Sequence, residues 1–159
     1  MNFKNLVFIF FLGISVVSCS QETNSENSQN KALIFAKGEK ITNSNFTGDV
    51  YLYNLVAADS LNQNAVGSVT FAPGARTKWH SHPAGQIILA IDGVGYYQEE
   101  GKDKVIVRKG QAIKCPADIP HWHGASADSA FVQVAITGRE KGETRWLQPV
   151  TDEEYADSN

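Results

Sequence analysis

The sequence lacks the features that mark several large protein classes. Two cysteines in 159 residues are too few for the disulfide framework of a small secreted scaffold. Basic residues are not in excess: 14 Lys and Arg stand against 17 Asp and Glu, and this net charge of -3 argues against nucleic acid as a partner. No internal repeat and no long amphipathic helical pattern is visible. With 42% hydrophobic and 19% charged residues, the chain is still suited to one folded domain.

The longest apolar run lies near the N-terminus and is too short to span a membrane. As a helix, residues 6–17 would be about 18 Å long, against a hydrocarbon core of about 30 Å. The run ends in VVSC, which resembles the lipobox of bacterial lipoproteins, where cleavage precedes a cysteine that is then lipidated. We predict a lipoprotein-type signal peptide over residues 1–18, lipidation of Cys19 and a polar tether over 19–40. The domain, residues 41–159, would then be exported and anchored facing the periplasm, touching the membrane only through its lipid. The alternative to the lipoprotein signal is an ordinary signal peptide in which Cys19 has no role.

From about residue 41 the chain consists of short segments rich in β-branched and aromatic residues. These segments are 50–56, 65–71, 86–91, 95–98, 104–108 and 130–136, and turn signals such as Asp92-Gly93 separate them. Short strands at this spacing indicate an all-β sandwich or barrel. Near the end, Thr151-x-x-Glu154 matches a capping box, so we expect one short C-terminal helical turn, with a frayed tail as the alternative.

All four histidines fall in two pairs, His80-x-His82 and His121-x-His123. On a strand, residues i and i+2 point to the same face, so each pair can direct two imidazoles into one cavity. The alternative is that one pair lies on a solvated face. Gln86 begins an otherwise apolar strand, where a buried amide without a partner costs about 1–3 kcal/mol. A metal would be such a partner, and exposure of the side chain is the alternative.

These residues carry a family resemblance. Gly74-x5-His80-x-His82-x3-Gln86-x6-Gly93 resembles the first cupin motif, with Gln86 where cupins usually have Glu. Gly110-x5-Pro116-x-Asp118-x2-His121 resembles the second, with Asp118 in place of its Gly. The resemblance implies an all-β fold, a cupin jelly-roll β-barrel over roughly residues 46–150, with the site inside its mouth.

The same resemblance implies a metal site. Its ligands would be His80, His82, Gln86 and His121, which together hold one divalent transition metal ion per chain. Manganese is the first expectation, and iron, nickel, cobalt and zinc are alternatives. Four neutral ligands leave the full charge of the ion, which favours Lewis-acid chemistry. We expect His123 to be the catalytic acid or base, with a fifth ligand or a structural hydrogen-bond partner as the alternatives.

Residues 74–86 and 115–125 resemble the small single-domain cupins that include bacterial manganese-dependent hydroxynitrile lyases. This implies a metal-dependent lyase that cleaves or forms cyanohydrins, acting on a small hydroxylated or carbonyl compound. Gln133 and Thr137 would line the pocket, at positions where those lyases tend to have His and Gln. The alternatives are a cupin dioxygenase and a non-catalytic periplasmic cupin that binds a metal or small ligand. A homodimer or higher homo-oligomer is expected by the same resemblance.

Overall fold

The computed structural model describes residues 33–156, which fall in one compact unit that begins at Leu33. The predicted signal peptide, Cys19 and most of the predicted tether lie outside these residues. Within the described part of the chain, no helix has the length and apolar character needed to cross a membrane.

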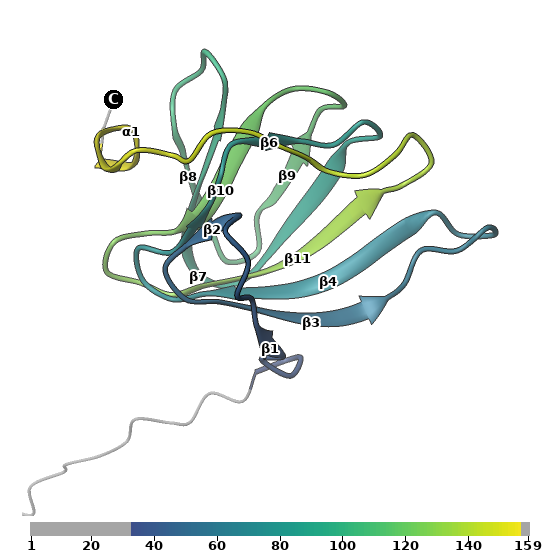
Figure 1. Cartoon of the computed structure of the whole chain (residues 1–159). Coiled ribbons are helices and arrows are strands. Elements are labelled where there is room, and N and C mark those ends of the chain that lie inside the picture. Colours follow the sequence, from purple (N-terminus) through teal and green to yellow (C-terminus); the bar gives the residue numbers. More distant parts are fainter. Residues whose placement is uncertain (1–32, 157–159) are drawn as a thin grey trace, which may run out of the picture. The chain divides into compact units, whose positions relative to one another are not determined.

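The described residues form an all-β fold with one short helix, as the sequence predicts (Figure 1). The helix α1 covers Asp152–Ala156. The strands are β1 (Glu39–Lys40), β2 (Phe46–Thr47), β3 (Val50–Val56), β4 (Asn64–Phe71), β5 (Arg76–Thr77), β6 (His80–Ser81), β7 (Gln86–Glu99), β8 (Val105–Arg108), β9 (Ala112–Cys115), β10 (His121–Ala125), β11 (Phe131–Gly138) and β12 (Arg145–Trp146).

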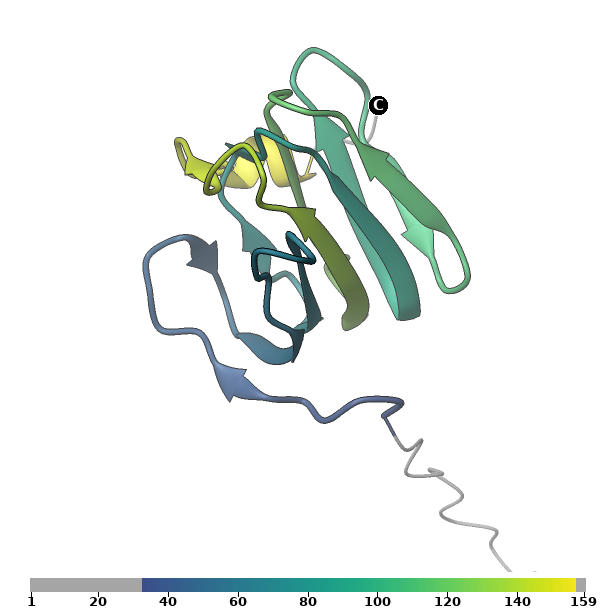
Figure 2. The same ribbon diagram turned by 90° about the vertical axis from the view of Figure 1, so that its right-hand side faces the viewer.

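The strands form one curled antiparallel sheet, in the order β1-β3-β4-β11-β7-β10-β5-β2. Figure 2 shows the curl, which brings the strands of the two ends to face one another. β7 belongs to both walls of the barrel: its first half pairs with β11 and β9, and its second half with β10 and β8. The two walls therefore share a strand, and side chains on their inner faces point into one interior.

The predicted turn at Asp92-Gly93 is wrong, because β7 runs without interruption through both residues. Gly93 has a φ of 75°, and a Cβ at this position would lie 1.8 Å from the carbonyl oxygen of Ala130. Glycine lets the backbone adopt this left-handed conformation in close contact with its neighbour. β7 therefore bends from one wall to the other here, close to the shift of its register with β11 between Val132 and Gln133.

Two apolar clusters stabilise the barrel. The larger fills the interior and includes Val50, Phe71, Ile88 and Phe131. The smaller lies on the other face of β10, where Trp122 is completely buried with Trp79 and Val150. The alternation along β10 thus directs Trp122 away from its neighbours His121 and His123, as strand geometry predicts.

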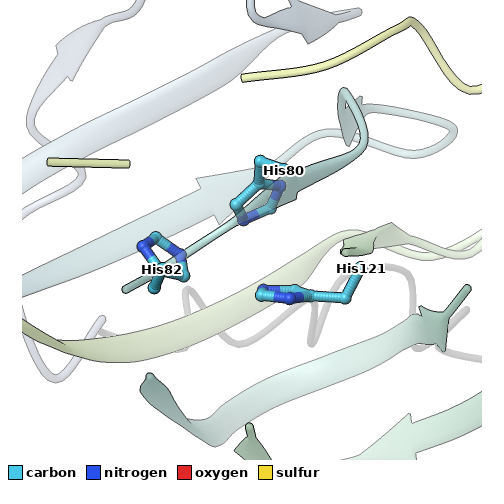
Figure 3. A group of neighbouring side chains, drawn as sticks. All are labelled: His80, His82 and His121. Atoms are coloured by element: carbon cyan, nitrogen blue, oxygen red, sulfur yellow. The ribbon is translucent and has the colours of Figure 1, made fainter. Parts of the chain in front are cut away.

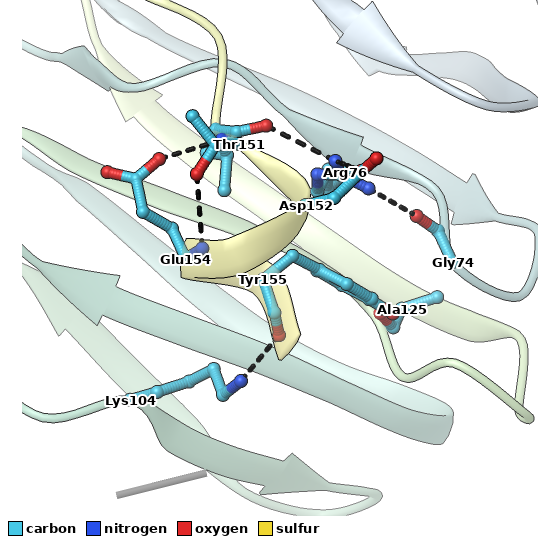
Figure 4. Close-up of polar contacts among 9 residues, drawn as sticks. Gly74, Arg76, Lys104, Ala125, Thr151, Asp152, Glu154 and Tyr155 are labelled. Carbon is cyan, nitrogen blue, oxygen red and sulfur yellow. Dashed lines mark hydrogen bonds and ion pairs between the residues drawn. The ribbon is translucent and has the colours of Figure 1, made fainter. Parts of the chain in front are cut away.

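The C-terminal segment packs against the smaller cluster. The predicted capping box is confirmed, since Glu154 N donates to Thr151 Oγ1 at 3.1 Å and Thr151 N donates to Glu154 Oε2 at 2.7 Å (Figure 4). Tyr155 donates its hydroxyl to the carbonyl of Ala125, and the buried Arg76 pairs with Asp152 at 2.6 Å. These contacts fasten α1 to the outside of the barrel.

Candidate metal centre

Three histidines converge where β6 meets β10. His80 and His121 are direct partners in the antiparallel pairing of these strands, and His82 follows β6. The ring centroid of His80 lies 4.4 Å from that of His121 and 5.0 Å from that of His82. One ligand atom from each residue lies within 4.8 Å of the others (Figure 3). The three rings thus form a cluster of the size that one ion requires.

Backbone carbonyls fix the orientation of two of these rings. His80 Nδ1 lies 2.9 Å from the carbonyl oxygen of Lys78, and His121 Nδ1 lies 2.9 Å from that of Ile119. A carbonyl oxygen only accepts, so each Nδ1 carries the proton and each Nε2 keeps its lone pair. The Nε2 atoms of His82 and His121 are buried without a hydrogen-bond partner among residues 33–156. The donor atoms needed for a metal are therefore free.

Burial keeps the three imidazoles uncharged, and the neutral imidazole is the form that binds metals. Desolvation lowers the pKa of His82 to about 3, helped by the charges of His121 and Arg139. Desolvation also takes the pKa of His80 well below its usual range, and the neighbouring imidazoles add to this shift. The pKa of His121 is lowered by the same burial.

The cluster borders a cavity of about 140 Å³. His80, His82 and Gln86 belong to its lining, and no Asp or Glu does among the described residues. Much of the remaining wall is apolar: Ile41, Phe46, Leu52, Val69, Phe71, Ala135 and Trp146. Cavities of roughly 150 Å³ accommodate a benzene ring, so this one suits a small molecule.

Gln86 is buried beside the cluster rather than exposed. Its Nε2 donates to Thr137 Oγ1 at 2.9 Å, so Oε1 is the end of the amide that can act as a metal ligand. The Gln86 side chain also raises the pKa of His82, against the larger effect of burial, so it acts directly on that ring. Cys115 lies behind it, with Sγ 3.9 Å from Gln86 Oε1. The ligand role of Gln86 stays a prediction, and its position suits it.

His123 lies in the same cavity but outside the group of three. Its ring centroid is 5.2 Å from that of His80 and 6.2 Å from that of His121. The ring packs edge-on against Phe71, and its Nδ1 is buried without a partner in the described chain. Burial lowers its pKa well below the usual range, with the nearby His121 and His82 adding to the shift, so the ring is neutral.

The structure places both residues predicted for the pocket, Gln133 and Thr137, on the cavity wall. Arg139, Thr144 and Trp146 also line the cavity beside the histidines, and none of them was predicted from the sequence. Arg139 Nη1 donates to Thr144 Oγ1 at 3.3 Å, and that hydroxyl lies 3.1 Å from His82 Nδ1. Trp146 packs on His80 with ring centroids 4.9 Å apart. Thr144 lies in a loop and Trp146 in the edge strand β12, and neither belongs to a sequence motif that would have indicated a role in the site.

Comparisons with known proteins agree with this geometry. The sequence model of a family described as "Cupin domain" matches residues 67–137. A protein of Granulicella tundricola named (R)-mandelonitrile lyase is 40% identical over 111 residues, which are 69% of this chain and 85% of that protein.

Solved structures give the same family. A cupin-like protein from Thermotoga maritima is 42% identical with a TM-score of 0.74, covering 78% of this chain and 95% of its own. A cupin 2 conserved barrel domain protein from Leptotrichia buccalis is 29% identical with a TM-score of 0.52, covering 58% of this chain and 42% of its own.

Proposed function

Because this chain belongs to the cupin family, we propose that it is a metal-dependent lyase that cleaves or forms the carbon–carbon bond of a cyanohydrin. The observation that carries the proposal is the cluster of three buried imidazoles, with the Nε2 atoms of His82 and His121 unpaired among the described residues, beside a small cavity that also contains His123. The name of the relative from Granulicella tundricola supports the same reaction class. Its substrate is a small hydroxylated or carbonyl compound.

The donor set fits a divalent transition metal ion. His80, His82 and His121 supply neutral imidazole nitrogens, and Gln86 supplies an amide oxygen, which suits manganese first and iron, nickel, cobalt or zinc as alternatives. Such an ion would act as a Lewis acid toward the substrate oxygen. No carboxylate lines the cavity among the described residues, so these ligands would bring no negative charge to the ion.

His123 handles the proton in this proposal. In cleavage, its imidazole accepts the hydroxyl proton of the cyanohydrin while the carbon–cyanide bond breaks and a carbonyl forms. The bonding electron pair leaves with cyanide, which then takes the proton from His123 as hydrogen cyanide. The apolar wall, with Phe71 against the ring of His123, keeps bulk water away from this transfer. A positioned acid–base group of this kind accelerates a reaction about 100- to 10,000-fold.

The test is to measure release of benzaldehyde from mandelonitrile by the purified protein, after its metal content has been determined. We expect turnover that a chelator abolishes and manganese restores. His123→Ala should keep the metal and lose at least about 100-fold in turnover, and His123→Gln should behave alike because it cannot shuttle a proton. Turnover that survives chelation would contradict the metal role. Oxygen uptake without cyanohydrin cleavage would indicate a dioxygenase instead, and ligand binding without turnover a binding protein.

Export remains a proposal that the N-terminal sequence supports. We infer that residues 1–18 are removed and that Cys19 anchors the protein as a lipoprotein facing the periplasm. Incorporation of a labelled fatty acid into the wild type, and none into Cys19→Ser, is the expected result. Cupin enzymes act on small molecules and are often oligomeric, and we expect a homodimer or larger homo-oligomer when the mass is measured by light scattering.

A further inference from the structure

Gln133 is a buried amide without a partner. Its side chain is completely buried, and both its Nε2 and its Oε1 lack a hydrogen-bond partner among residues 33–156. Native proteins satisfy the large majority of buried polar atoms, so two unpaired atoms on one side chain call for an explanation. Gln133 also belongs to the lining of the cavity, so a ligand bound there is a candidate partner for the amide.

The position of Gln133 on β11 separates it from Gln86. Thr137 pairs with Gln86 across the sheet, whereas Gln133 pairs with Ala90 on β7 and Val69 on β4. Four residues along a strand span about 13 Å, so the backbone of Gln133 lies about that far along the cavity wall from the backbone of Thr137. Ala135, between them on the same face, has a small side chain that leaves the cavity continuous.

We propose that Gln133 determines the substrate specificity of the reaction proposed above, by binding a second polar group of the substrate at the part of the cavity away from Gln86. That group both donates and accepts hydrogen bonds, since the amide offers one donor end and one acceptor end. The substrate is then a small compound with an apolar body and a hydroxyl at its far end.

The charges around the cavity and the size of the cavity favour a hydroxyl over a carboxylic acid as the substrate group that binds Gln133. An ionised carboxylate only accepts hydrogen bonds, so it would leave Gln133 Oε1 facing a negative charge. Arg139, the cation on the cavity wall, follows Thr137 at the opposite end of β11 and is paired with Glu143 at 2.7 Å. A hydroxyl supplies a donor and acceptors on one atom, which suits a cavity of about 140 Å³.

The experiment compares two probes of matched size, 4-hydroxybenzaldehyde and 4-methylbenzaldehyde, at a pH low enough to keep the phenol of the first protonated. Their affinities are measured by calorimetry for the metal-loaded wild type, for Gln133→Met and for the control Gln111→Met, an exposed residue outside the cavity lining. The wild type and the control should bind the hydroxyl probe at least about tenfold more tightly, because the hydroxyl gives the buried amide hydrogen-bond partners and the methyl group gives it none. Gln133→Met should reverse the preference. Equal affinities in the wild type, or an unchanged preference in Gln133→Met, would overturn the proposal.

The thermal unfolding midpoint of the free protein gives a second readout. Gln133→Met removes two unpaired polar atoms from the interior, so its midpoint should rise by about 4 °C. A lower midpoint would show that bound water already satisfies the amide, and the proposal would fall. The binding assay needs no turnover: a hydroxyl preference without cyanohydrin cleavage would refute the lyase reaction and leave the role of Gln133 standing, and cleavage without the preference would do the reverse.

Discussion

Metal binding should raise the thermal stability of this protein by an amount that can be calculated. A ligand at 100 times its dissociation constant stabilises the folded state by about 2.7 kcal/mol. Residues 33–156 make a domain of about 120 residues, for which the entropy of unfolding is roughly 0.26 kcal/mol per kelvin. Dividing the first quantity by the second gives a rise of about 10 °C in the unfolding midpoint.

The assay is thermal unfolding of each protein with a chelator and with manganese at saturation. His80→Ala, His82→Ala and His121→Ala should each lose most of the rise, because each removes one of three convergent imidazole donors. The metal-free midpoint of each variant is its own reference, which separates metal binding from the packing that the ring contributes. His123→Ala is the matched control, since its ring lies in the same cavity outside the ligand group.

Two results would refute this reasoning. If His123→Ala loses the rise as completely as His121→Ala, then His123 is a ligand and the proposed division of roles is wrong. If the three ligand variants keep the full rise, the metal binds elsewhere on the protein.

Three further predictions concern the surroundings of the site. Thr137→Val should weaken metal binding about fivefold by calorimetry, because the hydrogen bond that orients Gln86, worth about 1 kcal/mol, is lost; Thr137→Ser should restore it. In a Cys19→Ser background, Cys115 should react with a thiol reagent only after unfolding, because only 1% of its surface is exposed. Prompt reaction in the native state would contradict the packing described. Trp122→Ala should lower the free energy of unfolding by about 3–5 kcal/mol in a urea titration, because Trp122 fills the smaller apolar cluster, and a loss under 1 kcal/mol would contradict that role.

Local pattern was sufficient for the strands and for the direction of the histidines. The segment 50–56 is β3 with the predicted bounds, because alternating β-branched and aromatic residues favour a half-buried strand. The spacing His121-x-His123 determined that both rings share a face with Trp122 opposite, since successive side chains on a strand alternate. The capping box at Thr151 is likewise a local interaction, complete within four residues.

Tertiary structure decided what the local pattern left open. Asp92-Gly93 is a turn signal by itself, but pairing with β11 and β10 carries β7 through it, and Gly93 serves as a bend between two walls. The register of β7 with β11 determines that Gln86 is buried and that its amide donates a hydrogen bond to Thr137, which is 51 residues away in sequence. The unpaired amide of Gln133 has the same origin: its sequence neighbours give a strand, and only the curled sheet surrounds it with apolar side chains and a cavity.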